Sequence, residues 1–384
     1  DEAAVVREKH QRLEWLRGPD GPLHRWRTAA DAWCAAWFWP RVSRPSPTVV
    51  GDLIAEALRG AGGLRPGQRA PLLAQVADIA AREAFFHWSF EFPEVFAGAD
   101  GQPRADAGFD AILGNPPWDM VRAEDGRSRD DTSRLLAFVR HSGLYSRGAE
   151  AHVNRYQLFV ERTLDLLRHG GRLGLIVPWG LLGDAGAARV RRRLLDRATL
   201  DAVVAFENRR ALFPIHRSVR FAAICATRGA ATRALPLRPG EQDADPLERI
   251  PDRGASSEHF PVVVTRDALL ALSGEGMALP AVAHARALAL LLRLSAQHPA
   301  LADPQGWGAR FSRELNATDD RPHFVDAAAS TPPRDAYPIV EGKHLSPFVV
   351  DVGAHRWRLP RAAAAPRLRH RFEASRLAFR DVAG

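Results

Sequence analysis

The sequence predicts an α/β protein built on a parallel sheet, and three observations predict it. A short apolar run, Phe109–Gly114, ends at the turn-forming tetrapeptide Asn115-Pro116-Pro117-Trp118. From there to Thr227, apolar segments of strand length alternate with amphipathic helical segments, the pattern of strands joined by right-handed crossovers. Apolar residues make up 46% of the chain, yet no apolar run reaches the roughly 20 residues that span a bilayer. The apolar residues are therefore expected in a folded core, with no membrane partner.

Composition sets broad limits on function. The 384 residues leave room for two or three domains. The net charge of +8 suits a polyanionic partner. Only Lys9 and Lys343 are lysines and Ala is abundant, so the base composition of the genome explains that charge better than selection for nucleic-acid binding does. Local clusters of arginine are thus more informative than the total.

Cysteine and histidine predict no metal site. Cys34 and Cys225 are too few for a disulfide framework or a zinc site, and their apolar neighbours predict buried thiols. The histidines are scattered and lack the spacing of metal ligands. The first residues show no secretory signal, so the expected localisation is the cytoplasm.

Residues 1–104 are predicted to form a helical segment. Apolar positions recur at helical spacing in 53–58 and 72–80, and Gly and Pro between 60 and 67 separate the two helices. The segment is rich in tryptophan, which is more typical of a packed core than of a ligand-binding box.

Residues 105–228 are predicted to form the central α/β core. Its expected elements are a strand over 109–114, a polar loop over 119–150, a helix over 154–168, a strand over 173–177, a helix over 184–197, and strands over 200–206 and 219–227. Gly170-Gly171 is expected to end the first helix, and Pro178 the strand that follows it.

The remaining third of the chain changes character. Residues 229–258 are rich in Pro, Gly and acidic side chains, which predicts a linker or an insertion. Residues 259–384 show shorter mixed elements with one strong helix over 281–297. No internal repeat is visible.

The tetrapeptide Asn115–Trp118, called the NPPW motif below, carries the most chemical information. It follows a strand, where open α/β sheets bind ligands. The amino nitrogen of adenine is a poor nucleophile because its lone pair delocalises into the ring. An Asn amide oxygen and a backbone carbonyl can accept its two N–H hydrogens and support the nitrogen as it becomes tetrahedral.

The rest of the motif fits the same chemistry. Pro116 and Pro117 fix φ and stiffen the loop that holds the acceptors, and an aromatic side chain at 118 offers a face to a base flipped out of the duplex. The alternative is that strand-Gly-Asn-Pro-Pro is merely a tight turn.

Four segments together resemble the adenine-specific, amino-methylating DNA methyltransferases, in particular the large ones of type II restriction-modification and phage-defence systems. Phe109–Trp118 is similar to the catalytic motif of that family, and Tyr156–Pro178 to the helix and strand after it. Phe206–Phe221 resembles a later segment that supplies a second aromatic. Ile339–Lys343 resembles the start of the region leading to target recognition. The resemblance extends from about Ala30 onward.

The resemblance implies a fold, a cofactor and a substrate. The fold is the catalytic half of a Rossmann-like class I methyltransferase sheet, with the start of a mixed α/β target-recognition region over 259–384. S-adenosylmethionine is the implied cofactor, and double-stranded DNA with a flipped adenine the implied substrate. Catalytic roles fall on Asn115, Pro116, Pro117 and Trp118, base stacking on Trp118 and Phe213, and one wall of the cofactor site on Gly114 and Asn115. Phe213 has the alternative of a core residue before a strand.

Two departures from the family are visible. Trp118 stands where Tyr or Phe is usual, which changes the width of the base pocket. No glycine-rich loop follows a strand before Asn115, since Gly60-Ala61-Gly62-Gly63 follows helical sequence. The cofactor-loop half is therefore expected outside this chain, as part of a longer protein or of a partner chain.

Arginine clusters suggest contacts with DNA phosphates, for which the candidates are Arg191, Arg192, Arg210 and Arg217. Residues 355–380 add eight Arg and one acidic residue, Glu373. A solvated charged face is the alternative.

Other functions remain open. A DNA-binding or regulatory remnant that needs a partner chain for the cofactor would keep the fold without turnover. A related methyltransferase acting on RNA or on a protein glutamine is a third possibility. The spacing of Asp335, Glu341 and Lys343 resembles that of metal-dependent nucleases, but no supporting strand pattern accompanies it.

Overall fold

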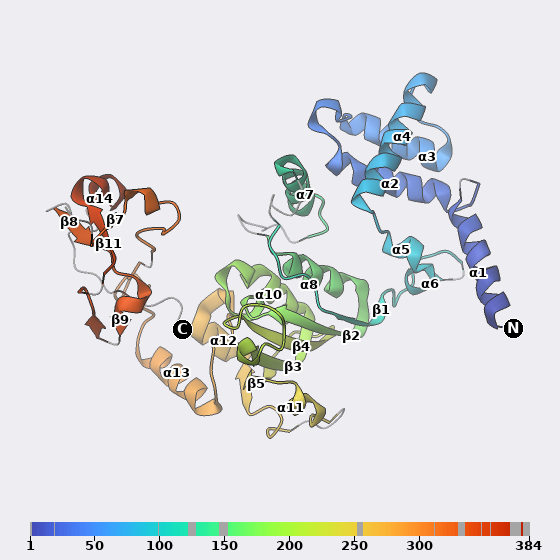
Figure 1. Cartoon of the computed structure of the whole chain (residues 1–384). Coiled ribbons are helices and arrows are strands. Elements are labelled where there is room, and N and C mark those ends of the chain that lie inside the picture. Colours follow the sequence, from blue (N-terminus) through green and yellow to red (C-terminus); the bar gives the residue numbers. More distant parts are fainter. Residues whose placement is uncertain are drawn as a thin grey trace. The chain divides into compact units, whose positions relative to one another are not determined.

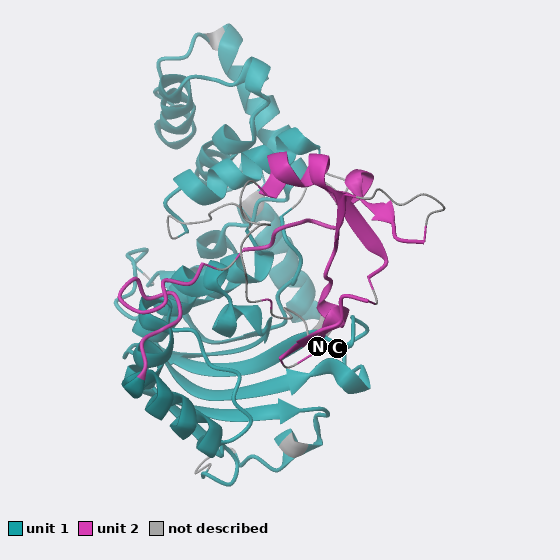
Figure 2. Cartoon of the chain, turned by 90° about the vertical axis from the view of Figure 1, so that its left-hand side faces the viewer, with its two compact units in different colours: residues 1–297 teal, residues 298–384 magenta. Residues whose placement is uncertain are grey.

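The computed structural model describes residues 2–18, 20–98, 100–121, 128–145, 153–251, 256–310, 312–328, 335–346, 348–353, 355–368 and 378. The chain divides into two compact units, 1–297 and 298–384 (Figure 2). No helix in the described ranges is long and apolar enough to cross a membrane.

The first unit begins with the predicted helical segment. Its helices are α1 (Glu2–Arg17), α2 (His24–Phe38), α3 (Pro47–Arg59), α4 (Pro66–Glu83), α5 (Trp88–Glu91) and α6 (Pro93–Phe96), with a 3₁₀ turn over Arg41–Ser43. Helix α3 shows how local sequence sets the bounds: the Ser46 hydroxyl accepts from the Val49 amide, and Gly60 ends the helix at φ +64°. Trp39, Leu53 and Ile79 are buried at the centre of this segment.

A six-stranded sheet forms the centre of the first unit (Figure 1). Its strands are β1 (Phe109–Gly114), β2 (Leu167–Pro178), β3 (Ala198–Glu207), β4 (Arg220–Arg228), β5 (Ala234–Glu241) and β6 (Val262–Thr265). They lie in the order β1-β2-β4-β3-β5-β6. Strands β1 and β2 are parallel, as are β3 and β5, whereas β4 and β6 run antiparallel to their neighbours. Four of the six strands, β1, β2, β3 and β5, run in the same direction, and this mixed α/β sheet confirms the predicted Rossmann-like class.

Two details of the predicted core differ from the structure. The last predicted strand, β4, is antiparallel and inserts between β2 and β3. Gly170-Gly171 does not end a helix. Helix α8 (Arg155–Leu166) ends earlier, and β2 starts at Leu167 because that side chain is fully buried and pairs with Phe109 of β1.

Helices cover one face of the sheet. These are α8, α10 (Ala188–Arg197), α12 (Arg266–Ser273) and α13 (Ala285–Gln297), and their buried side chains pack with Leu175, Val203 and Ile224 of the sheet. The other face carries a smaller aromatic cluster that contains Phe206 and Phe221. Alternate residues of β2, β3 and β4 thus face two different cores.

The segment 229–258 is not simply a linker. Residues 234–241 form β5, which pairs with β3, and residues 245–248 form the short helix α11. Strand β6 then pairs with β5. The sheet therefore continues through the predicted linker, and the compact first unit extends to residue 297. Helix α7 (Arg129–His141) likewise lies within the predicted polar loop.

The second unit is small and has its own core. It contains a three-stranded sheet in the order β7-β11-β8, a hairpin of β9 and β10, and helix α14. The bounds are β7 Val325–Asp326, β8 Ala336–Pro338, β9 Leu345–Ser346, β10 Val349–Val350, β11 Trp357–Pro360 and α14 Arg361–Leu368. Leu359, Ala364 and Leu368 are buried together.

The junction of β1 and β2 generates a first prediction. Gly108→Ala is expected to lower the free energy of unfolding by about 1–3 kcal/mol, the cost of comparable backbone strain. Gly108 has φ +127°, and a Cβ there would lie 2.4 Å from the Arg168 nitrogen. Urea unfolding measures the change. Gly51→Ala in α3 is the control, because its Cβ meets nothing within 4 Å; unchanged unfolding of Gly108→Ala would contradict the tight junction.

Candidate active site

The NPPW motif lies at the carboxyl end of β1. Strand β1 ends at Gly114, and Asn115 is exposed immediately after it. Pro116 is buried, which anchors the loop, while Pro117 is exposed and Trp118 is half-buried. The motif therefore occupies the sheet edge where α/β proteins bind their ligands.

Asn115 and Trp118 are joined directly. The Trp118 indole Nε1–H donates to Asn115 Oδ1 at 3.0 Å, and the same N–H lies 3.4 Å from the backbone oxygen of Ile176 in β2. The catalytic candidate amide and the stacking candidate thus form one hydrogen-bonded pair over the sheet edge.

Phe213 also reaches this place. Its ring centroid is 5.6 Å from that of Trp118 with the planes at 62°, and 5.0 Å from that of Phe221. Phe221 in turn stacks on Phe206 at 4.9 Å. The two predicted stacking residues are brought together by an aromatic cluster on the face of the sheet opposite helices α8 and α10.

The two stacking candidates are in mutual contact. A base held between two aromatic faces needs about 7–8 Å between them, twice the usual contact distance of 3.5–4.0 Å. The edge-to-face contact of Trp118 and Phe213 leaves less than that. A base can enter between them only if one of the rings moves.

Asn208 holds the loop that carries Phe213, a role that the sequence analysis missed. Its side chain is fully buried. The amide nitrogen donates to the carbonyls of Phe213 and Ile215 at 3.1 and 3.2 Å, and the amide oxygen accepts from the Phe213 N–H at 3.0 Å. The available signal was a polar residue directly after a strand and shortly before the aromatic.

A large cleft borders the motif. Its volume is about 1370 Å³, and Gly114, Asn115 and Pro116 line it together with aromatic side chains of the helical segment and of α8. Leu113 of β1 is 82% exposed and Phe159 of α8 is 52% exposed. The cleft exceeds the 300–1,000 Å³ typical of small-molecule sites and leaves apolar surface uncovered.

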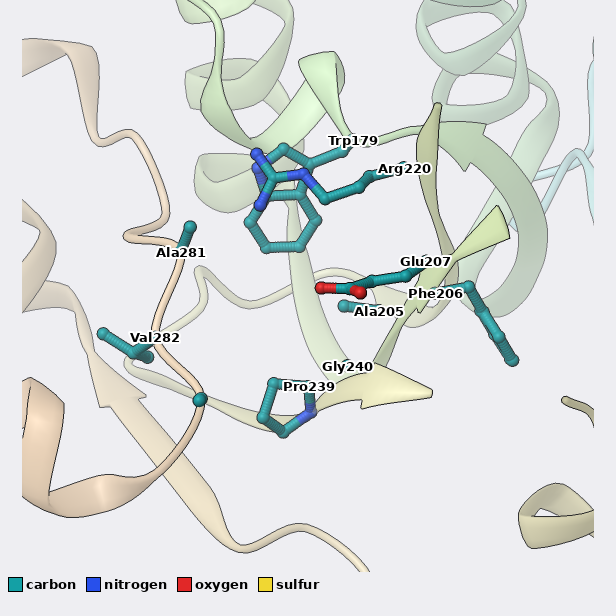
Figure 3. A pocket seen from close by; sticks show the side chains of 10 residues that line it. Trp179, Ala205, Phe206, Glu207, Arg220, Pro239, Gly240, Ala281 and Val282 are labelled. Atoms are coloured by element: carbon teal, nitrogen blue, oxygen red, sulfur yellow. The ribbon is translucent and has the colours of Figure 1, made fainter. Parts of the chain in front are cut away.

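A second, smaller pocket lies at the same edge of the sheet (Figure 3). Trp179, Glu207 and Arg220 line it, and its volume is about 130 Å³. The Arg220 guanidinium lies 5.4 Å from the centre of the Trp179 ring, and Glu207 pairs with Arg209 at 2.8 Å. This space is below the usual size of a ligand site and holds none of the predicted catalytic residues.

The prediction that Arg191 contacts phosphate is wrong. Its side chain is 1% exposed. Its guanidinium donates to the carbonyl oxygens of Leu181, Asp184 and Gly276, which ties α10 to the turns beside it. Burial lowers the pKa of this guanidinium from its usual value, and the nearby Asp184 opposes that shift. Arg191 is a structural cation that DNA cannot reach.

The other three phosphate candidates lie at the surface. Arg192 pairs with Glu275 at 3.1 Å and its side chain is 40% exposed, whereas Arg210 pairs with Asp243 at 2.7 Å and is 66% exposed. Arg217 is exposed in the loop after Phe213. Arg210 and Arg217 therefore flank the aromatic candidate, whereas Arg192 belongs to helix α10. Most of the Arg-rich stretch 369–380 lies outside the described residues.

Loss of the Asn208 amide is expected to release the Phe213 loop. Asn208→Ala should lower the free energy of unfolding by about 1–3 kcal/mol, since it removes the three hydrogen bonds that the buried amide makes to the loop. Trypsin should also cut faster after Arg209, Arg210 and Arg217. Asn154→Ala is the matched control, because Asn154 makes no capping bond at α8. Wild-type stability and cleavage in Asn208→Ala would show that the loop is held otherwise.

Comparisons with known proteins find similarity over part of the chain. Residues 59–213, which include the NPPW motif and Phe213, match the family model described as Eco57I restriction-modification methylase. Over 86 residues the chain is 36% identical to a type II methyltransferase of Thermus thermophilus, a match that covers 21% of this chain and 19% of that protein. The match thus spans about a fifth of the length of this curated relative.

Solved structures overlap with the chain only in part. The type IIG restriction endonuclease BpuSI shares 13% identity over 63% of this chain and 30% of its own, with a TM-score of 0.33. The M protein of the type I restriction enzyme EcoKI shares 13% identity over 72% of this chain and 73% of its own, with a TM-score of 0.31. The family model and the Thermus relative support a restriction-modification methyltransferase family for this chain.

Proposed function

We propose that this chain carries the catalytic half of a DNA methyltransferase that transfers a methyl group from S-adenosylmethionine to the exocyclic amino group of adenine. The observation that carries the proposal is the Asn115 amide, placed at the carboxyl end of β1 beside an aromatic cluster. We place the enzyme in restriction-modification or phage defence, in line with the matched family.

The acceptors of the motif suit an amino group. Asn115 Oδ1 and the Pro116 carbonyl oxygen are neutral acceptors, so they accept hydrogen bonds from the two amino hydrogens without deprotonating the amino group. Interactions that strengthen as the nitrogen becomes tetrahedral lower the barrier to transfer. Pro116 is the buried residue of the motif, and its burial keeps these acceptors from shifting.

Trp118 and Phe213 are the aromatic residues proposed to bind the flipped base. A duplex adenine reaches the motif only when it is flipped out, and Trp118 and Phe213 are the residues that stack on it. Since their rings contact each other, capture includes an opening step, in which we assign the movement to Phe213. The Trp118 N–H is held by Asn115 Oδ1 in the loop and by the backbone oxygen of Ile176 in β2.

The cleft beside Gly114 fits one wall of a cofactor site. S-adenosylmethionine, when bound, supplies an electrophilic methyl group. Its polar end would lie against Gly114 and Asn115, and the cleft has room for it. The residues that bind the rest of the cofactor, a glycine-rich turn and an acid for the ribose, are proposed to come from a further segment or from a partner chain.

Strand β1 offers a place for that further half. Among the described residues β1 pairs with β2 on one side only, so it is an edge strand of the sheet. Edge strands expose N–H and C=O groups that pair with added strands. Leu113, 82% exposed on β1, would be covered by such an addition.

Double-stranded DNA is the proposed substrate, with Arg192, Arg210 and Arg217 as phosphate contacts. The exposed positions of Arg210 and Arg217 on either side of Phe213 suit a role in holding the strand that carries the flipped base. The second candidate function is a DNA-binding subunit without turnover, which the one-sided cofactor cleft favours.

The role of Asn115 has a direct test. Asn115→Ala in an otherwise complete enzyme is expected to lower kcat at least 100-fold, the usual effect of losing one transition-state hydrogen-bonding group, while DNA affinity changes little. Radiolabelled methyl transfer and filter binding measure the two quantities. Gln68→Ala, at an exposed position of α4, is the control and should leave kcat near wild type. Near-normal turnover of Asn115→Ala would remove Asn115 from the mechanism.

The proposed missing half predicts weak cofactor binding. One wall buries little of a ligand, whereas good sites enclose roughly 70–90% of theirs. Calorimetric titration of the isolated chain with S-adenosylmethionine should show no binding or binding in the millimolar range. Adding a chain with the glycine-rich turn should restore micromolar affinity. Micromolar binding by this chain alone would mean that a cofactor loop lies within it, around Gly60–Gly63.

A further inference from the structure

We propose that the Trp118 indole N–H is a positioning group that sets the orientation of the Asn115 amide. The proposal rests on the proposed function and adds a second role to a residue assigned so far to stacking. It is carried by the 3.0 Å hydrogen bond from Trp118 Nε1 to Asn115 Oδ1, which a Tyr or Phe at the same position cannot make.

The indole is held by the sheet in addition to its bond to the loop. Its N–H lies 3.4 Å from the backbone oxygen of Ile176, in the interior of β2. Its ring centroid lies 5.6 Å from that of Phe221 on β4, with the planes tilted by 39°. Two paired strands therefore fix the donor, and the donor in turn fixes the amide.

The Asn115 amide needs such a guide. Its two ends, C=O and NH₂, have nearly the same shape, and the residue is exposed. Among the described residues, Trp118 is the partner of its side chain. With the oxygen end turned to the aromatic cluster, the amide accepts from an incoming amino group. With the NH₂ end there, the Asn115 amide nitrogen and the adenine amino group would both be donors, so no hydrogen bond would form and methyl transfer would stop.

The hydrogen bond from Trp118 leaves Asn115 Oδ1 able to accept a second hydrogen bond. An amide oxygen has two lone pairs, so Oδ1 accepts from the indole and keeps one lone pair for an amino hydrogen of adenine. The Pro116 carbonyl takes the second amino hydrogen. Stacking alone would be served by any aromatic side chain, whereas this geometry requires the indole N–H.

The hydrogen bond is tested first in the chain by itself. The indole ¹H–¹⁵N resonance of Trp118, identified by its loss in Trp118→Phe, should shift and exchange faster with solvent in Asn115→Ala. Asp119→Ala, next to the motif, is the control and should leave the resonance in place. An unmoved resonance in Asn115→Ala overturns the proposal, because the bond is then absent in solution.

Function is tested with an isostere. Replacing Trp118 by β-(3-benzothienyl)alanine puts sulfur in place of the N–H and keeps the size and the stacking face. In the complete enzyme kcat should fall about tenfold, the size expected of one hydrogen bond, with unchanged KM for DNA. Quenching of a fluorescent adenine analogue at the target should also stay at the wild-type level. The same replacement at the exposed Trp15 of α1 should change nothing.

The outcomes separate this inference from the proposed function. Wild-type kcat in the isostere overturns the positioning role and leaves the proposed function intact. A loss of base quenching equal to the loss of kcat also overturns it, because the N–H then serves base capture. Full activity of Asn115→Ala, or no methylation of adenine by the wild-type enzyme, overturns the proposed function and this inference with it.

Discussion

The insertion of β4 between β2 and β3 is the constraint on which the candidate site depends. The register pairs Phe221 with both Pro178 and Phe206, so an aromatic ring is placed at the edge of three adjacent strands. Trp118 packs against that ring and its N–H lies near the Ile176 oxygen, while Phe213 contacts both Phe221 and Trp118. A register shift of one residue would turn Phe221 to the helix-covered face and remove the support from both candidates.

Elements with strong periodicity were predictable, but the direction of β4 and the existence of β5 were not. Strand β1 has the bounds that its apolar run indicates. The hydrophobic pattern carries no information on strand direction, and the clue for β4 was the short connection after β3, which contains no α-helix. Strand β5 contains Pro236, Pro239 and Gly240, residues that disfavour strands. It forms because β3 and β6 pair with it on both sides.

The placement of the candidate residues could be predicted where they are neighbours in the sequence, and not where burial decides their role. Asn115 and Trp118 are three positions apart, and the motif alone indicates a shared site. Arg191 and Asn208 show the limit. The sequence places Arg191 on an Arg-rich helix, which suggests a phosphate contact, but in the structure its guanidinium is buried and bonded to the Leu181 and Gly276 carbonyls. An Asn after a strand suggests a turn residue, but the Asn208 amide is bonded to the Phe213 loop.

The two halves of the aromatic pair are held by different means, which has a mechanical consequence. Trp118 is bonded to a stiff Pro-Pro loop and to a strand oxygen, so its movement would also disturb the Asn115 acceptor. Phe213 is held through its backbone, because the Asn208 amide hydrogen-bonds to the Phe213 N–H and C=O. Its ring makes no hydrogen bonds. Rotation of that side chain costs ring contacts but no buried polar group. In the proposed mechanism, the base pocket therefore opens on the Phe213 side while Asn115 and Trp118 keep their geometry on the other.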